Sequence, residues 1–226
     1  KCTHCGNIKV HYNSCGNRNC PTCQGANREK WILDRKYDLL SVPYFHVVFT
    51  LPDLLRDLFM YNKEQMYNML FLCVKETLTD FSQDPKWKLN AKIGFIAILH
   101  TWTQKMEYHP HIHCIVPGGG INKEGKWCTS KGSEDFLFHV GSMAETFRGK
   151  IMECIDQMYY DINGNLKLEG KLEYLKNPAN FEQLKSMLYK KNWVVHTEKP
   201  FDSPDQVFEY LARYTHKIAI SNYRIK

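Results

Sequence analysis

The stretch Tyr108-His109-Pro110-His111-Ile112-His113-Cys114-Ile115-Val116, ended by Pro117-Gly118-Gly119-Gly120, is the one from which the fold can be worked out. A short run of apolar and β-branched residues bounded by proline and glycine predicts a strand. Because successive side chains of a strand alternate between its faces, His109, His111 and His113 share one face. Ile112 then points the other way, into apolar packing. His109 precedes a proline and lies at the strand entry.

Two imidazoles on alternate positions of a rigid strand can bind one divalent cation, provided that a third ligand completes the site. A buried strand is predicted at 92–100, and it is expected to pair with the histidine strand as a hairpin. His100 ends that strand and would meet the pair across the hairpin. If the strand continues, Gln104 shares its face and is the alternative third ligand. The spacing therefore predicts a metal site at His111, His113 and either His100 or Gln104; core histidines are the competing interpretation.

Outward from this hairpin, strands and helices alternate along the 226 residues. Hydrophobic periodicity and turn residues predict further strands at 44–50 and 193–196. Helical spacings and capping residues predict helices at 26–42, 53–81, 136–159 and 178–191, and a last one from the capping stretch Ser203-Pro204-Asp205 to about residue 219. A sheet of a few strands with helices in the long connections is an α+β layout.

Cysteines are concentrated at the start of the chain, where five of the nine lie within the first 23 residues. Cys2-x-x-Cys5 and Cys20-x-x-Cys23 form two knuckles whose four thiolates suit the tetrahedral preference of Zn²⁺. Cys15 is a spare ligand, either for this site or for a second one completed by residues upstream. An odd number of cysteines without a secretory signal argues against a disulfide scaffold. We therefore expect structural zinc and a reducing, cytoplasmic location.

The positive charge is also concentrated at the start. The chain carries a formal net charge of +6, and residues 1–36 hold seven of its 30 Lys and Arg against only two acidic residues. A basic module in front of a nearly neutral body suggests a polyanionic partner, with a solvated basic surface as the alternative. We expect a zinc-binding module with a linker helix at 1–36 and a second domain at 37–226. The apolar runs are too short to span a bilayer, so no membrane partner is expected.

Two tyrosines lie one turn apart in the last predicted helix, within Tyr210-Leu211-Ala212-Arg213-Tyr214. Their hydroxyls face the same way, at the boundary between the apolar arc of the helix and its basic face. The simplest interpretation is a pair of core-edge tyrosines. Beside a metal site, however, a phenol can act as a nucleophile that leaves a phosphate covalently bound to the protein, because the metal polarises that phosphate.

Taken together and in this order, five motifs closely resemble the two-tyrosine HUH (histidine–hydrophobic–histidine) transposases of bacterial insertion sequences. That family is related to rolling-circle replication initiators, conjugative relaxases and Helitrons. The motifs are Asn13-Ser14-Cys15-x-Asn17-Arg18-x-Cys20-Pro21-x-Cys23-Gln24, Val42-Pro43-Tyr44-Phe45-His46-Val47-Val48-Phe49-Thr50-Leu51-Pro52, Leu99-His100-Thr101-Trp102, His109-Pro110-His111-Ile112-His113-Cys114 and Tyr210-Leu211-Ala212-Arg213-Tyr214-Thr215-His216.

The resemblance implies a transposase zinc-binding domain followed by an HUH nuclease domain on a central antiparallel sheet with flanking helices. It also implies that single-stranded DNA is cleaved at transposon ends through a 5′-phosphotyrosine intermediate, in rolling-circle-like transposition. Tyr210 and Tyr214 match the two nucleophiles by position, and His111 and His113 match the HUH pair. Family members usually extend further at both ends, so we expect a chain truncated at both ends.

For the third ligand, His100 resembles the upstream histidine of relaxases, whereas Gln104 resembles the polar ligand of replication initiators. The implied cofactors are Mg²⁺ or Mn²⁺ at the HUH site and structural Zn²⁺, and the implied partner is single-stranded DNA in the nucleoid. No nucleotide cofactor is expected, because no Walker-type glycine loop is present. Basic residues would hold the DNA phosphates: Arg18, Arg28, Lys30, Arg213 and Lys217.

Three alternatives remain at this stage. A plasmid replication initiator or a relaxase would use the same HUH chemistry. A non-catalytic, zinc-dependent DNA-binding protein would instead use its histidines and tyrosines for structure alone.

Overall fold

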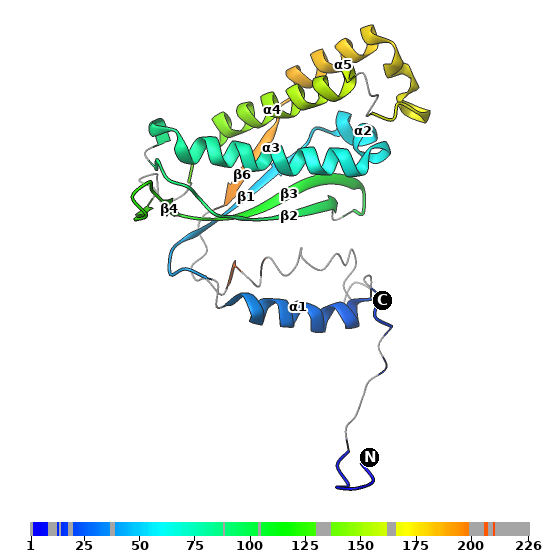
Figure 1. Ribbon diagram of the computed structural model, residues 1–226. Helices are drawn as coiled ribbons and strands as arrows, with labels where there is room; N and C mark the ends of the chain where they lie inside the picture. Colours follow the sequence, from blue (N-terminus) through cyan, green and yellow to red (C-terminus); the bar gives the residue numbers. More distant parts are fainter. Residues whose placement is uncertain are drawn as a thin grey trace.

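The computed structural model describes residues 2–8, 13, 15–17, 20–36, 39–87, 89–103, 105–129, 137–161, 166–198, 206–207 and 210. Figure 1 shows how the elements of this part of the chain are arranged. In chain order they are α1 (Pro21–Lys36), β1 (Tyr44–Thr50), a 3-10 turn (Asp53–Leu55), α2 (Arg56–Tyr61), α3 (Lys63–Gln83), a second 3-10 turn (Pro85–Trp87), β2 (Ile96–Trp102), β3 (Tyr108–Pro117), β4 (Gly119–Ile121), β5 (Trp127–Thr129), α4 (Val140–Tyr160), a 3-10 segment (Gly170–Lys176), α5 (Pro178–Lys190) and β6 (Val194–Glu198).

A four-stranded antiparallel sheet organises the molecule, with strand order β2-β3-β1-β6. Its central strands are rich in the β-branched and aromatic residues that suit a pleated, buried surface. β4 and β5 form a separate two-stranded ribbon. The antiparallel sheet with flanking helices confirms the predicted α+β class, and the pairing of β2 with β3 confirms the predicted hairpin.

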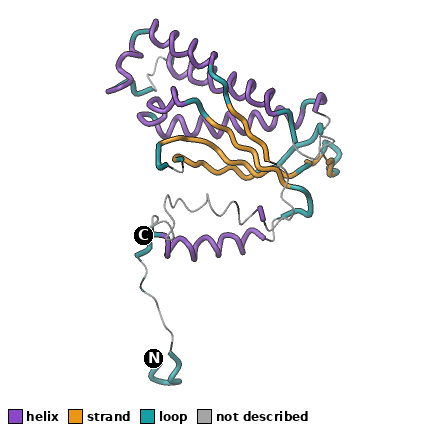
Figure 2. The backbone as a smooth tube through the Cα atoms, turned by 180° about the vertical axis from the view of Figure 1, so that it is seen from behind, coloured by secondary structure: helices purple, strands orange, loops and turns teal. Residues whose placement is uncertain are grey.

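The two faces of the sheet are packed differently. One face presents Phe49, Ile112 and Cys114 to the main hydrophobic core, which α3 and α4 cover. The opposite face carries the histidines, and there α1 packs Ile32 against Tyr44 and Ile115. Figure 2 shows the same layers from behind, with α1 on the far side of the sheet from the long helices. As predicted, Ile112 points away from the histidines into apolar packing.

Most predicted elements are confirmed, and three differ in their bounds. The single helix predicted at 53–81 is divided at Asn62 into α2 and α3, after a 3-10 turn at Asp53–Leu55. The helix predicted at 26–42 is α1, which begins at Pro21, because proline is well suited to the first turn of a helix. The strand predicted at 92–100 begins only at Ile96, since Lys92 pairs instead with Ile121 of β4. Of the last predicted helix, the described residues Gln206, Val207 and Tyr210 are helical.

None of the described helices combines the length and the apolarity that crossing a bilayer requires.

Candidate metal and tyrosine site

The antiparallel pairing of β2 and β3 assembles three histidines on one face of the sheet. His100 lies directly opposite His111 in the register, and His113 follows two residues later on the same face. One ring nitrogen of each lies within 4.8 Å of the others. Such a group can supply three ligands to a single cation. Gln104, the predicted alternative to His100, lies outside the described residues.

The tautomer of His111 is set by its own strand. Its Nδ1 lies 2.7 Å from the carbonyl oxygen of His109, and because a carbonyl can only accept, Nδ1 carries the proton and donates it. Nε2 then bears the lone pair, on the side where it lies 3.1 Å from Nδ1 of His100. A hydrogen bond of this kind is what orients a metal-binding imidazole and fixes its coordinating nitrogen.

A fourth histidine, which was not predicted from the sequence, contacts this group from β1. His46 is only 1% exposed, and its Nε2 lies 2.9 Å from Nδ1 of His113, with the two rings stacked 6° from parallel. Its other nitrogen, Nδ1, lies 3.0 Å from Oε2 of Glu198 at the end of β6. The sequence signal was present but weak: His46 alternates with the core residues Val47 and Phe49, so it had to face the histidine side.

Burial keeps these imidazoles neutral. Loss of solvent, reinforced by the neighbouring imidazoles, lowers the pKa of His113 to about 2 and that of His100 to about 4. Burial also lowers the pKa of His111, against the opposing effect of the His109 carbonyl, and that of His46, against the opposing effect of Glu198. The neutral form is the one that binds a metal, so the site is ready to bind at neutral pH.

Tyr210, one of the two predicted nucleophiles, lies against the fourth histidine, His46. Its half-buried ring meets the ring of His46 edge to face, with the centroids 4.6 Å apart and the planes 67° apart. The fold thus brings a phenol from the last predicted helix next to the histidine of β1. The other predicted residues of this helix, Tyr214, Arg213 and Lys217, lie outside the described residues.

At the other end of the chain, the sulfurs of Cys15, Cys20 and Cys23 lie within 4.8 Å of one another, at the start of α1. Cys2 and Cys5 do not join this group. They lie in a separate turn at the N-terminus, set apart from α1 in Figure 1. Within that turn, backbone hydrogen bonds from Cys5 and His4 lower the pKa of the Cys2 thiol, which favours the thiolate that binds metal. The structure therefore presents a group of three thiols and a separate pair.

The predicted DNA-binding residues near these cysteines are only partly described. Lys30 is exposed on α1, whereas Arg18 and the side chain of Arg28 lie outside the described part of the chain.

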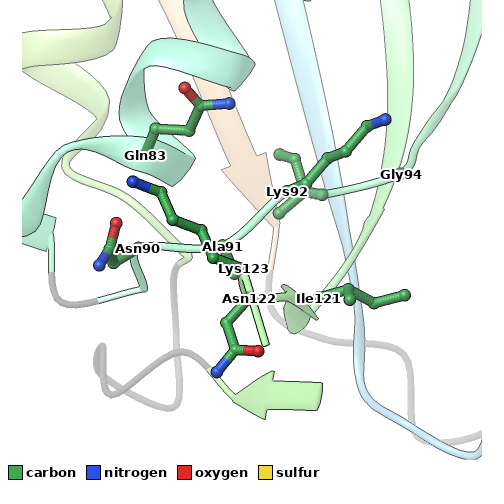
Figure 3. A pocket seen from close by; sticks show the side chains of 9 residues that line it. Gln83, Asn90, Ala91, Lys92, Gly94, Ile121, Asn122 and Lys123 are labelled. Carbon is green, nitrogen blue, oxygen red and sulfur yellow. The ribbon is translucent and has the colours of Figure 1, made fainter. Parts of the chain in front are cut away.

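A separate hollow of about 670 Å³ lies between the end of α3 and β4 (Figure 3). Its polar side chains are amides and ammonium groups, from Gln83, Asn90, Lys92, Asn122 and Lys123. None of its nine lining residues carries a carboxylate, thiol or imidazole, so this hollow offers no charged or imidazole ligand for a cation. Among the described residues of the sheet, the three histidines are the group that could hold a metal ion.

Comparison with known families matches two parts of the chain. Residues 94–226, more than half of the chain, match the family described as "Putative transposase", and residues 1–51 match the family described as "Transposase zinc-binding domain". The first match contains β2, β3 and both predicted tyrosines. The second contains all five cysteines of the N-terminal region.

Two curated proteins are similar along nearly the whole chain. The "Putative transposase y4qJ" of Sinorhizobium fredii is 40% identical over 225 residues, which cover 99% of this chain and 55% of that protein. The "Transposase for insertion sequence element IS801" of Pseudomonas savastanoi pv. phaseolicola is 27% identical over 222 residues, which cover 98% of this chain and 50% of that protein. The chain thus spans about half the length of the curated relatives it matches.

Among solved structures, the metal-bound conjugative relaxase TrwC in complex with OriT DNA aligns with a TM-score of 0.39 at 12% identity, covering 79% of this chain and 67% of that one. TrwC complexed with a 27-mer DNA aligns with a TM-score of 0.39 at 10% identity, covering 74% and 65%.

Proposed function

The chain belongs to the transposase family whose model matches residues 94–226, and from this premise we propose that it nicks and rejoins single-stranded DNA at transposon ends. The observation that carries the proposal is the contact of Tyr210 with His46, whose ring is in turn within hydrogen-bond distance of His113 in the histidine group of the sheet. A phenol beside a group able to hold a divalent cation has both parts that a phosphotyrosine mechanism needs.

His100, His111 and His113 would hold the cation. Three neutral imidazoles favour Mn²⁺ over Mg²⁺, because Mg²⁺ prefers oxygen ligands. When bound, the cation supplies positive charge that stabilises the charge developing on the scissile phosphate. The histidines contribute by presenting lone pairs from rings fixed on paired strands, so little reorganisation is needed on binding.

In the proposed first step, the phenol oxygen of Tyr210 attacks phosphorus. An oxygen–phosphorus bond forms to the tyrosine, which loses its proton, and the bond from phosphorus to the 3′-oxygen breaks. That oxygen takes up a proton and leaves as a free 3′-OH, while the 5′-phosphate stays on the protein. Because the phosphodiester bond energy is conserved in this link, rejoining by attack of a 3′-OH requires no nucleotide cofactor, and Tyr214 would cleave the next strand by the same chemistry.

The N-terminal region would hold the DNA. Structural zinc bound by Cys20 and Cys23, with Cys15 or with Cys2 and Cys5, would order the segment that precedes α1. Its basic side chains would then contact phosphates, which position the DNA without selecting a sequence. The proposed phosphate contacts of this region are Arg18, Arg28 and Lys30, and those of the last predicted helix are Arg213 and Lys217.

A covalent-capture experiment tests the proposal. The chain is incubated with Mn²⁺ and labelled single-stranded DNA that carries a transposon end, and protein–DNA adducts are counted on a denaturing gel. We expect an adduct that requires the metal and disappears in the double variant Tyr210→Phe plus Tyr214→Phe. The single variant Tyr67→Phe, which alters a tyrosine bonded to Tyr108 away from the histidine group, is the matched control and should leave the adduct intact. An adduct that persists in the double variant, or none from the intact chain, would contradict the proposal.

A further inference from the structure

We propose that His46 and Glu198 are positioning residues that fix which nitrogen of His113 is available to a metal. The three residues form a line of hydrogen bonds, Glu198–His46–His113, called here the carboxylate–histidine relay. The inference rests on the proposed function in one respect, namely that the histidine group of the sheet is a metal site.

The relay is built by the strand order of the sheet. β1 lies between β3 and β6, so it faces the metal-site strand on one side and Glu198 on the other. In the register, His46 pairs with Ile115 and with Glu198. Side chains of paired residues lie on the same face, which brings all three polar groups together without any local turn or loop.

The protons of the relay can be assigned by following the donors from the carboxylate. An ionised carboxylate only accepts, so Nδ1 of His46 donates across the 3.0 Å to Glu198. A neutral imidazole has one proton, so Nε2 of His46 must accept, and Nδ1 of His113 donates across the 2.9 Å between them. Nε2 of His113 therefore carries the lone pair that a cation needs.

The opposite assignment shows why the carboxylate matters. If the proton of His46 were on Nε2, Nδ1 of His113 would have to accept, and the proton of His113 would lie on Nε2, where it blocks coordination. Glu198 selects against this arrangement, because it would then face the lone pair of His46. Hydrogen bonds from outside the ligand set commonly fix the tautomer of a metal-binding histidine in this way.

His46 also contacts Tyr210. The plane of its ring is 6° from parallel to that of His113, and its ring meets Tyr210 edge to face, with centroid separations of 5.1 Å and 4.6 Å. A single buried side chain therefore lies against both a proposed ligand and a proposed nucleophile. The tautomer of His111 is set differently, by the backbone carbonyl of its own strand. The two histidines of the HUH pair are thus oriented by different means, one local and one from distant strands.

Metal binding without DNA provides the first test. Titration calorimetry with MnCl₂ is carried out on the intact chain and on His46→Leu, which fills the space but removes both hydrogen bonds. We expect Mn²⁺ affinity to fall about 10- to 100-fold, the usual cost of losing a partner that orients a ligand. His46→Gln places an amide oxygen near the position of Nε2 and should recover part of the affinity.

Two further variants separate positioning from a folding defect. Glu198→Gln changes a side chain that is 47% exposed, so the fold should survive, and affinity should fall by less than in His46→Leu. His196→Gln is the matched control on the same strand, because His196 is 62% exposed and lies 4.0 Å from the same carboxylate. It should leave Mn²⁺ affinity within about twofold of the intact chain, a margin below the 10-fold lower limit expected for a ligand-orienting partner.

Long-range ¹H–¹⁵N spectra of the metal-free chain provide the second test, and they do not depend on metal. We expect His113 protonated on Nδ1 in the intact chain and a shift towards Nε2 in His46→Leu. Unchanged affinity and an unchanged tautomer in both His46→Leu and Glu198→Gln would overturn the relay while leaving the proposed function standing. Failure of the intact chain to bind Mn²⁺ would instead overturn the metal site itself.

Discussion

The histidine group of the sheet and the cysteine group before α1 are both candidate metal sites, yet they are built in opposite ways. His100, His111 and His113 lie on paired strands whose other face is buried in the main core. Cys15 and Cys20, by contrast, lie on the loop before a helix, and Cys15 is exposed to solvent.

The two sites differ in what holds their ligand side chains in position. Strand pairing, core packing and hydrogen bonds hold the imidazoles in place before any metal is bound. The cysteine region, with few aliphatic residues, has no such support and needs its metal to become ordered, as small zinc modules do. We therefore propose that metal at the sheet serves chemistry, whereas metal at the cysteines serves folding.

Removing zinc should have the largest effect, and it should be confined to one region. Structural zinc contributes about 10–16 kcal/mol to folding in small zinc modules, so a chelator should remove the hydrogen-exchange protection of residues 2–23. Protection of β1 and β3 should stay unchanged. Hydrogen exchange followed by mass spectrometry measures both regions at once. If the chelator also removed protection from the sheet, the claim that the sheet is ordered independently of zinc would be wrong.

A cavity in the core should produce the converse result. Leu70 of α3 is fully buried, so Leu70→Ala should lower the free energy of unfolding by about 2–5 kcal/mol. Leu72→Ala, two residues along the same helix and 46% exposed, is the matched control and should change it by less than about 0.5 kcal/mol. Urea denaturation gives the free energies. Zinc content should be the same in all three chains, and a lower content in Leu70→Ala would contradict two independent sites.

Removing one of the proposed histidine ligands on the sheet should strongly weaken metal binding, with little effect on the fold. We expect His111→Ala to weaken Mn²⁺ binding by more than about 100-fold, which corresponds to about 2.7 kcal/mol. The melting temperature of the metal-free chain should stay close to that of the intact chain, because core packing holds the strands. His196→Ala serves as the control for loss of an exposed histidine of β6. A His111→Ala chain that unfolds would instead indicate a structural role for that histidine.

Acidification should have a smaller effect, centred on the sheet. The pKa values of His100 and His113, about 4 and about 2, lie below the value of about 6.5 for an unfolded histidine. Below pH 6.5 the unfolded chain therefore binds protons that the folded chain does not, and stability decreases towards pH 4. Thermal melts of the metal-free chain from about pH 7.5 to about pH 4.5 should show this decrease, and His100→Gln should make it shallower. An equally steep decrease in His100→Gln would contradict the assignment.

The smallest expected effect concerns DNA binding at the cysteine end. A plot of log affinity against log salt concentration has a negative slope. Lys30→Ala should make this slope shallower by about 0.7 for single-stranded DNA, which is the loss of one phosphate contact. Lys190→Ala removes an exposed lysine of α5 on the opposite side of the sheet and should leave the slope unchanged. Fluorescence anisotropy at several salt concentrations measures both. Equal slopes in the two variants would remove Lys30 from the DNA-binding surface.

Much of the fold could be predicted from local sequence patterns. Strand β1 has the predicted bounds, Tyr44–Thr50, because it is a run of β-branched and aromatic residues between Pro43 and Leu51-Pro52. The meeting of His100 with His111 was also predictable, since a hairpin joins neighbours in sequence. His46 was missed as a site residue for the converse reason. Its partner Glu198 lies 152 residues away, and only the pairing of β1 with β6 brings them together.

The cysteines show a second limit of sequence patterns. Two Cys-x-x-Cys knuckles are compatible with one four-thiol site, and Cys15 was predicted only as a spare. In the structure Cys15 lies 3.6 Å from Cys23, sulfur to sulfur, while Cys2 and Cys5 lie in a turn of their own. Spacing counts residues but does not determine the path of the loop between the knuckles, and that path decides which sulfurs meet.

The central claim is that one of the two tyrosines of the last predicted helix, Tyr210 or Tyr214, becomes linked to DNA, and peptide mapping of the adduct tests it most directly. Arg213 separates Tyr210 from Tyr214 in the sequence, so trypsin places the two tyrosines in different peptides. After nuclease trimming, mass spectrometry should find a nucleotide joined through its 5′-phosphate to the peptide that contains Tyr210 or to the one that contains Tyr214. A nucleotide joined to any other residue would contradict the account.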